Sequence, residues 1–292
     1  MKVQPFNYPL DERLLKKIDL MIARCIQKNP KKDAVLLFEG AEGEGKTTFS
    51  AAVGYYVKLK TGREFNHTRM FFDLKEMIKF AQTTEEEIIV WDEPALQALS
   101  KDTLTTIVKD LERLLMMARK KRHFIMINMA YFNKFNEYIV WQRPLGMIHV
   151  YSRKEIHSGR YVYIKKKALE QLWHSWRRRR KRDYRKYCSK SIRGTFPDVL
   201  NPKYKNNVLS DFDLNYYEKK KDEAIMKIGF KEEKKDIYAK YKWAIAQLVY
   251  ELMKASGKKM KEITEVIKIN DRNIRNWKHL TPIEEKPLEI WG

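Results

Sequence analysis

A glycine-rich segment near the start of the chain has residue types and spacing suited to holding a phosphate. It reads Gly40, Ala41, Glu42, Gly43, Glu44, Gly45, Lys46 and Thr47. The apolar run 34–38 precedes it and a helix-like run, 48–58, follows it. Glycines let the backbone turn tightly, so that its N–H groups face an anion with no Cβ in the way. We therefore expect a strand, a phosphate-binding loop (P-loop) and a helix, in that order.

The same segment predicts which atoms would touch a nucleotide. The start of the following helix adds free N–H groups and partial positive charge. Lys46 can reach the β- and γ-phosphates of ATP, and the Thr47 hydroxyl can ligate Mg²⁺. A chance glycine-rich turn is the alternative, but the context on both sides favours the P-loop. The predicted nucleotide-binding residues are Gly40, Glu42, Gly43, Glu44, Gly45, Lys46, Thr47 and Thr48.

A second acidic motif follows about 45 residues later. The apolar run 88–91 leads directly into Asp92 and Glu93. At the carboxyl end of a buried strand, Asp92 can join Thr47 in holding the Mg²⁺ shell, and Glu93 can orient or deprotonate the attacking water. The alternative is a buried strand that ends in surface acids. Its position after a P-loop favours the catalytic interpretation.

Length and composition limit what the rest of the chain can be. The 292 residues are 43% hydrophobic, which is enough for a core, and allow one large domain or two to three small ones. No apolar run approaches the roughly 20 residues of a membrane span, and the N-terminus lacks signal-peptide features. Cys25 and Cys188 are the two cysteines, which favours a reducing, cytoplasmic location.

The charge is unevenly distributed along the chain. The net charge of +22 divides into +5 for residues 1–150 and +17 for residues 151–292. The first half therefore resembles an ordinary enzyme, and the second half a binder of polyanions. Nucleic acid is the first candidate for the polyanion, and an anionic membrane surface is the second. The third explanation is that the charge only makes the protein soluble.

Two segments of the second half could contact nucleic acid. The segment 165–193 contains only two acids and interleaves aromatic with basic residues, which suits phosphate contacts and stacking. We expect it to be mostly helical and to end before Gly194; a solvated basic helix or a localisation signal is the alternative. Its candidate nucleic-acid contacts are Arg177, Arg178, Arg179, Arg180, Lys181 and Arg182.

The last fifth of the chain has a helix-turn-helix-like pattern, with expected helices at 236–256, 260–267 and 271–278. The first should turn an apolar face inward, made of Ile237, Tyr241, Ile245, Leu248, Val249 and Leu252. The others should bury Ile263, Ile267, Ile269, Ile274 and Trp277. The residues expected to face the nucleic acid are Arg272, Asn273, Arg275, Asn276 and Lys278. A helical bundle for protein contact is the alternative.

The elements that must position these residues indicate an α/β fold. We expect a three-layer P-loop NTPase core with a mostly parallel five-stranded sheet and a β-hairpin at 147–164. A basic helical region and a small all-α domain follow it. The expected boundaries are an ATPase domain at 1–165, a basic region with a linker at 166–235, and a helical domain at 236–292. The segment 195–213 is interpreted as a linker or irregular loop.

The order of these elements resembles the additional-strand P-loop ATPases over about residues 10–165. That group includes RecA-like motors, AAA+ proteins, FtsK/HerA-type DNA pumps, terminase motors and zonular-occludens-toxin-like phage-assembly ATPases. The resemblance implies nucleotide roles for Lys46, Thr47, Asp92 and Glu93, and it makes Asn128, at the end of the run 124–128, the sensor of the γ-phosphate. A polar strand end is the alternative for Asn128. No sensor-2 arginine, nuclease acids or transmembrane segment is apparent.

Arg143 is the first candidate for a charge-stabilising finger, acting in its own or a neighbouring subunit, and Arg160 the second. A structural or nucleic-acid-contacting arginine is the alternative for both.

These observations predict an ATP- and Mg²⁺-dependent ATPase that binds nucleic acid, with DNA as the first candidate, and forms a homo-oligomer. Hydrolysis would drive movement, packaging or remodelling of DNA for a virus or mobile element, and the location would then be a host cytoplasm. A nucleotide-switched regulator of loader, partition or transposition-target type is the alternative. A small-molecule kinase is a third possibility.

Overall fold

The computed structural model describes residues 8–26, 32–92, 101–153, 157–188, 191–201 and 211–277. At 101–104, 153, 157, 158 and 227–240 it describes the backbone alone. Two compact units divide the chain, Met1–Ala224 and Ile225–Gly292, and each is described by itself. The described helices include none that is long and apolar enough to cross a membrane.

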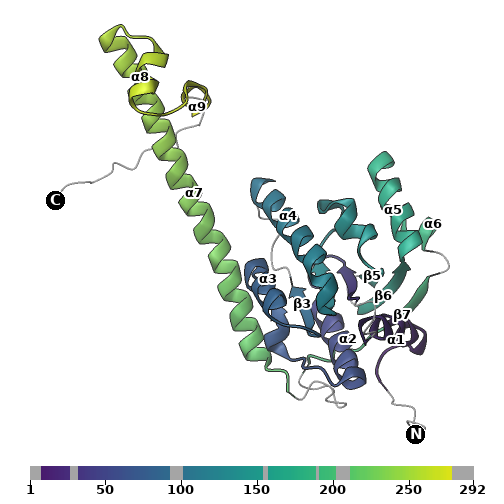
Figure 1. Ribbon diagram of the computed structural model, residues 1–292. Helices are drawn as coiled ribbons and strands as arrows, with labels where there is room; N and C mark the ends of the chain where they lie inside the picture. Colours follow the sequence, from purple (N-terminus) through teal and green to yellow (C-terminus); the bar gives the residue numbers. More distant parts are fainter. Residues whose placement is uncertain are drawn as a thin grey trace. The chain divides into compact units, whose positions relative to one another are not determined.

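One seven-stranded sheet forms the centre of the first unit (Figure 1). Its spatial order is β2-β3-β4-β1-β5-β6-β7. The strands from β2 to β5 run parallel, and β6 and β7 continue the sheet in antiparallel pairing. The strand bounds are β1 Ala34–Glu39, β2 Met70–Phe71, β3 Ile88–Asp92, β4 Phe124–Met129, β5 Gly146–Arg153, β6 His157–Lys165 and β7 Ile192–Thr195.

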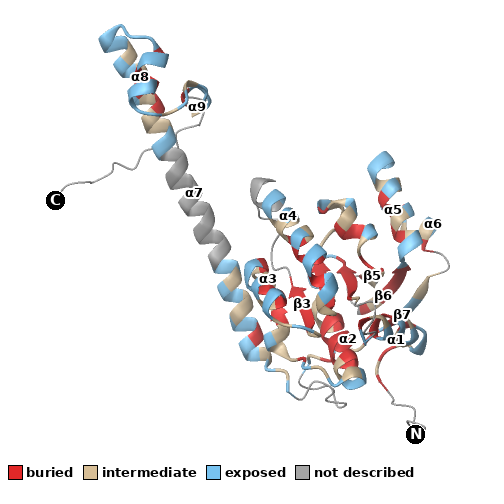
Figure 2. Cartoon of the chain, viewed as in Figure 1, coloured by how far each residue is buried: buried red, intermediate tan, exposed pale blue. Residues whose placement is uncertain are grey.

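Strands β1, β3 and β4 are buried along their whole length, as Figure 2 shows. Their near-continuous apolar sequences suit a parallel sheet that is covered on both faces. β4 lies between β1 and β3, which is the additional-strand arrangement. The register pairs Asn128 with Asp92 on one side and with Phe38 on the other. The polar ends of β3 and β4 therefore lie beside the segment that follows β1.

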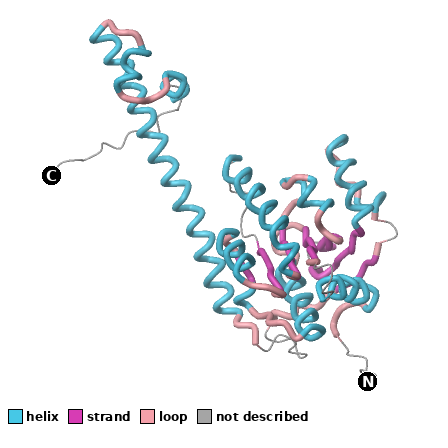
Figure 3. Tube along the Cα trace, viewed as in Figure 1, coloured by secondary structure: helices cyan, strands magenta, loops and turns pink. Residues whose placement is uncertain are grey.

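Helices cover both faces of the sheet, in the three layers that Figure 3 shows. Helices α1 and α2 pack on one face, and α3, α4 and α5 pack on the other. The helix bounds in this unit are α1 Glu12–Ile26, α2 Lys46–Thr61, α3 Leu74–Thr83, α4 Lys101–Met117, α5 Lys166–Arg179 and α6 Tyr184–Tyr187. Short 3₁₀ helices lie at His67–Arg69, Ala118–Lys121 and Phe132–Lys134, and a π-helix lies at Tyr138–Gln142. The mixed α/β class predicted from the sequence is therefore confirmed.

The middle of the chain agrees with the sequence only in part. The basic segment 165–193 is mostly helical, as expected, but it is divided into α5 and α6, because α5 ends at Arg179, where Arg180 adopts a left-handed φ of 56°. Strand β7 then pairs with β6 and extends the expected five-stranded sheet and hairpin to seven strands. The first compact unit runs to Ala224, past the boundary at residue 165 that was expected for the ATPase domain, because Phe196 and Tyr217 are buried in its core.

His123 makes the stability of this unit depend on pH. It is fully buried; its Nε2 donates to the Ala81 carbonyl at 2.9 Å and its Nδ1 accepts from the Glu87 N–H at 3.1 Å. Both bonds suit the neutral ring, and burial lowers the pKa of His123 from its ordinary value of 6.5. Below about pH 6.5 the unfolded chain therefore takes up a proton that the folded chain does not, and stability falls.

We expect urea unfolding to show wild-type stability declining from pH 8 to pH 5.5, and His123→Gln to remove part of that decline. The exposed His174→Gln variant is the control and should retain it. Equal pH dependence in wild type and His123→Gln would contradict this assignment.

The second unit contains most of α7 (Leu214–Ser256), with α8 (Met260–Val266) and α9 (Asp271–Trp277). Helix α7 is continuous from the region expected to be basic and to contain a linker, 166–235, into the helix expected at 236–256. The core of the unit consists of Ala246, Val249, Met260, Ile263 and Ile274, with Ile245, Ile269 and Trp277 packed against it. Three helices around a small apolar core agree with the predicted all-α character of this region.

Some expected core positions are nevertheless exposed. Tyr241, Leu248 and Leu252 of α7 are each at least half exposed, and Ile267 is 37% exposed. The side chain of Ile237 lies outside the described residues. The short helices α8 and α9 cover only one face of α7, so its wide apolar stripe cannot be buried within this unit alone.

Candidate functional site

The loop between β1 and α2 has the backbone that a P-loop needs. Gly45 has a φ of 90° and Gly43 a φ of 77°, in the left-handed region that favours glycine. Gly40 passes so close to β5 that a Cβ there would lie 2.3 Å from the Val150 carbonyl oxygen. Helix α2 begins at Lys46, so its first N–H groups face the concave side of the loop. The loop is thus shaped to receive an anion.

Hydrogen bonds join the predicted metal and sensor residues into one cluster. The Thr47 hydroxyl donates to Asp92 Oδ2 at 2.8 Å. Asn128 Nδ2 donates to Asp92 Oδ1 at 3.0 Å and to the Ser50 hydroxyl at 2.9 Å. Asp92, Asn128 and Ser50 are all buried. Three motifs far apart in sequence therefore meet at the carboxyl ends of β1, β3 and β4.

The oxygen atoms of this cluster fit a Mg²⁺ ion. Mg²⁺ prefers hard oxygen ligands and is usually held by one or two protein groups together with phosphate oxygens and water. Thr47 and Asp92 supply such oxygens. Asn128 Oδ1 is buried and has no hydrogen-bond partner among the described residues. The described chain contains no cluster of three or more His, Cys, Asp or Glu that could hold a metal.

Tyr217, in the first turn of α7, also contacts the carboxylate of Asp92. Its hydroxyl donates to Asp92 Oδ2 at 2.5 Å. Burial, together with the charge of Asp92, raises the pKa of Tyr217 well above its ordinary value, so the hydroxyl remains a donor. The ring is buried against Phe72 and Phe212. Asp92 Oδ2 therefore carries two hydroxyl donors in this structure, one from Thr47 and one from Tyr217.

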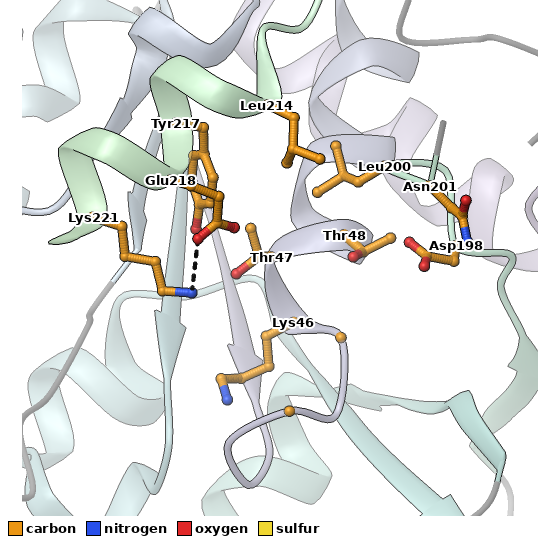
Figure 4. Close-up of a pocket in the computed structure, with 12 residues that line it drawn as sticks. Lys46, Thr47, Thr48, Asp198, Leu200, Asn201, Leu214, Tyr217, Glu218 and Lys221 are labelled. Atoms are coloured by element: carbon orange, nitrogen blue, oxygen red, sulfur yellow. Dashed lines mark ion pairs between the residues drawn. The ribbon is translucent and has the colours of Figure 1, made fainter. Parts of the chain in front are cut away.

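A pocket of about 490 Å³ opens beside this cluster (Figure 4). Its volume lies within the range of about 300–1,000 Å³ that is usual for small-molecule sites. One side consists of P-loop and α2 residues, and the other of the segment after β7 and the start of α7. The lining residues are Gly43, Gly45, Lys46, Thr47, Thr48, Asp198, Leu200, Asn201, Leu214, Tyr217, Glu218 and Lys221.

Lys46 lies folded over its own loop, where Nζ donates to the carbonyls of Gly40 at 2.9 Å and Ala41 at 2.7 Å. Glu42 is exposed, whereas Glu44 accepts a hydrogen bond from the Ser152 hydroxyl of β5 at 3.0 Å. The side chain of Glu44 thus holds the loop to the sheet, while its backbone faces the phosphate position.

The remaining catalytic predictions have different outcomes. Glu93 lies outside the described residues, so its role stays a prediction. Arg143 is not free to act as a finger in its own subunit: it pairs with the fully buried Asp33, and its Nε donates to the Leu115 carbonyl at 3.1 Å. Asp33 precedes β1, so this pair lies at the end of the strand opposite the P-loop. Arg160 is half-buried in β6 and remains a candidate.

Comparisons with known proteins add little to this geometry. None of the known protein-family models matches the chain, and no curated protein is similar enough to count as a relative. Among solved structures, the chain is similar to the DnaC helicase loader, with 23% identity and a TM-score of 0.27. That match covers 44% of this chain and 75% of that chain.

The predicted nucleic-acid residues of α5 and the segment after it are exposed. Arg177, Arg178 and Arg179 project from the last turn, while Leu169, Leu172 and Trp173 face the core. Arg180 lies over the Trp176 ring at 4.8 Å, and Lys181 is also exposed. Arg182 differs because it lies 3.6 Å from the buried carboxylate of Glu39 and over the Tyr131 ring. The guanidinium group of Arg182 therefore already interacts with Glu39 and Tyr131 within the protein.

In the second unit, the exposed side chains of α9 are Arg272, Asn273, Arg275 and Asn276, as the helix-turn-helix pattern predicts. Asn270 caps this helix, because its Oδ1 accepts from the Arg272 N–H at 2.9 Å. Arg275 pairs with Asp271 at 3.3 Å. Lys278 lies outside the described residues. Whether these residues bind nucleic acid stays a prediction.

Sequence reasoning missed one wall of the pocket. The segment 195–213 was expected to be a linker, but it contributes Asp198, Leu200 and Asn201. Tyr217 and Lys221 fell in a lysine-rich stretch without a motif. The signal in the sequence was composition. Phe196, Val199, Phe212 and Tyr217 give the polar stretch 195–217 more large apolar residues than a linker normally has.

Proposed function

We propose that this chain is an ATPase that binds ATP with Mg²⁺ in the pocket beside α2 and that acts on nucleic acid. The observation that carries the proposal is the contact of Thr47 with Asp92 beside Asn128, next to the pocket that the P-loop lines. The P-loop and α2 would hold the phosphates. Mg²⁺, when bound through Thr47 and Asp92, would neutralise the charge that develops on them.

The residues of this chain have separate tasks in such a reaction. Lys46 would move from the carbonyls of its loop to the phosphates. Asn128 is held by Asp92 and Ser50, so it is rigid and close to the metal-binding oxygens. Glu93, which follows Asp92 directly, would orient the water. These groups would act by positioning and by electrostatic stabilisation, the main contributions to phosphoryl transfer.

The nucleic-acid part of the proposal rests on the charge of +17 in residues 151–292 and on the exposed arginines of α5. Replacing Arg177, Arg178 and Arg179 together by Gln should weaken binding to duplex DNA and reduce its salt dependence. The slope of log K against log salt should become shallower by about 0.9 for each DNA phosphate that the variant no longer neutralises. Fluorescence anisotropy at several salt concentrations measures both quantities.

A matched control removes three exposed charges elsewhere, by Lys60→Gln, Lys75→Gln and Lys79→Gln together. It should leave the slope nearly unchanged. If both triple variants lower the affinity equally, α5 is only one part of a general positive surface. If neither does, the nucleic-acid contact lies elsewhere.

A nucleotide-switched regulator is the second candidate, and Tyr217 favours it. Its bond to Asp92 Oδ2 would have to rearrange when a metal shell forms there, so nucleotide binding would change the start of α7. ATP turnover measured with and without single- and double-stranded DNA separates the two. Strong stimulation with strand movement supports a motor, whereas slow turnover with assembly on DNA supports a switch.

A further inference from the structure

The pocket extends beyond the part that phosphates would fill. Figure 4 shows Lys46 and Thr47 near the middle of the pocket, with Tyr217, Glu218 and Lys221 on one side and Asp198 and Asn201 on the other, beyond Thr48. Leu200 and Leu214 lie between these two sides. Beyond the phosphate end, the pocket therefore offers a polar group beside Thr48 and a separate apolar surface. In a nucleotide the ribose follows the phosphates and the base follows the ribose, so the polar group suits the ribose and the apolar surface suits the base.

The segment after β7 is built firmly into the first unit. Phe196 stacks on Phe49 of α2, with ring centroids 4.2 Å apart and an interplanar angle of 14°. Its N–H donates to the Gly159 carbonyl at 2.8 Å, and Val199 is buried. Asp198 is exposed between these two anchors. Its backbone carbonyl accepts from the Asn201 N–H at 3.2 Å, which closes a turn.

The opposite wall is anchored on the same helix. Tyr55 and Lys58 of α2 bind the carboxylate of Asp211, at 2.7 Å and 2.5 Å respectively. The Asp213 N–H donates to His67 Nδ1 at 3.0 Å. These bonds fix the start of α7, and with it Leu214 and Tyr217. Both walls are therefore positioned relative to α2, the helix whose first residues face the phosphate position.

A carboxylate in a pocket for a polyphosphate needs an explanation. Asp198 would repel phosphate, and its ionised side chain can only accept hydrogen bonds. It therefore suits a neutral group with donors, and the ribose of a nucleotide carries two neighbouring hydroxyls. In Figure 4 Asp198 points toward Thr48, which lies where the α-phosphate, the group next to the ribose, is expected. Leu200 and Leu214 offer apolar surface for the faces of a base.

We propose, building on the proposed ATPase function, that residues 198–201 and Leu214 form a nucleoside subsite, in which Asp198 accepts hydrogen bonds from the ribose hydroxyls. The subsite selects ribonucleotides over 2′-deoxyribonucleotides. Leu200 and Leu214 hold the base by apolar contact, without recognising its sugar.

Calorimetric titration of the full-length protein with ADP and with 2′-deoxy-ADP, both with Mg²⁺, tests the subsite. Wild type should bind ADP about tenfold more tightly, since a hydrogen bond to a charged group is of that order. Asp198→Ala should lose this preference and bind the two ligands with equal affinity, no more tightly than wild type binds 2′-deoxy-ADP. Leu200→Asn should weaken both ligands by the same factor and keep the preference.

Glu64→Ala is the matched control, since it removes an exposed carboxylate that does not line the pocket, and it should behave as wild type. Equal affinity of wild type for the two ligands would overturn the subsite, and so would an Asp198→Ala variant that keeps the preference. If wild type binds neither ADP nor ATP, the proposed ATPase function itself fails. The two failures are thus distinguishable.

Discussion

Lys46→Ala should lower the rate of ATP hydrolysis by about 100-fold or more, since removing one preorganised group that stabilises developing charge typically has this effect. Lys46 lies at the start of α2, and its ammonium group rests on the carbonyls of Gly40 and Ala41. It supplies the positive charge at the head of the P-loop. Steady-state phosphate release, measured with saturating Mg²⁺ and ATP, is the readout.

The substitution should leave the fold intact. Lys46 is only half-buried, and surface substitutions usually change stability by less than about 0.5 kcal/mol. The control is Lys60→Ala, which removes an exposed lysine from the other end of the same helix. It should keep wild-type turnover. Full turnover by Lys46→Ala would show that the P-loop is not the catalytic site.

Arg143→Ala should lower the free energy of unfolding by about 3–5 kcal/mol, because it leaves a buried charge without its partner. Asp33 is fully buried and pairs with Arg143, whose side chain is 10% exposed. Urea unfolding followed by circular dichroism measures the change. The exposed Arg13→Ala variant, which also breaks an ion pair, should change stability by less than about 1 kcal/mol.

A double variant separates the pair from the individual residues. Asp33→Asn combined with Arg143→Gln removes both charges, so it should be less destabilised than the sum of the single variants. The same proteins test the role first expected for Arg143. A finger would lose ATP turnover while the stability stayed near that of wild type. A structural arginine loses stability first, and that is the expected result.

The position of the candidate phosphate site could be predicted from local sequence. The apolar runs of β1, β3 and β4 are long enough to form buried strands, and each leads into a polar residue or a glycine-rich turn. Parallel strands bring their carboxyl ends to one edge of a sheet. The meeting of Thr47, Asp92 and Asn128 therefore follows from patterns within each segment, together with the additional-strand order.

Other parts of the site depend on contacts between distant segments. Strand β7 has four residues, one of them glycine, and gains its stability from pairing with β6. No local sequence pattern predicts this pairing. The sequence made Arg143 a candidate for an arginine finger because it did not reveal the ion-pair partner, Asp33, which lies 110 residues away. The choice between a buried ion pair and a free cation depends on burial, which spacing does not reveal.

The sequence by itself thus determined the P-loop, the α/β class and the cluster at the ends of β1, β3 and β4, because sterics and periodicity act over a few residues. Only the tertiary structure decided what closes the pocket. Residues 196–201 and Tyr217 join the site because Phe196 stacks on Phe49 and the Tyr217 hydroxyl donates to Asp92. Such contacts form when apolar surfaces from distant segments are buried together, and that depends on the whole fold.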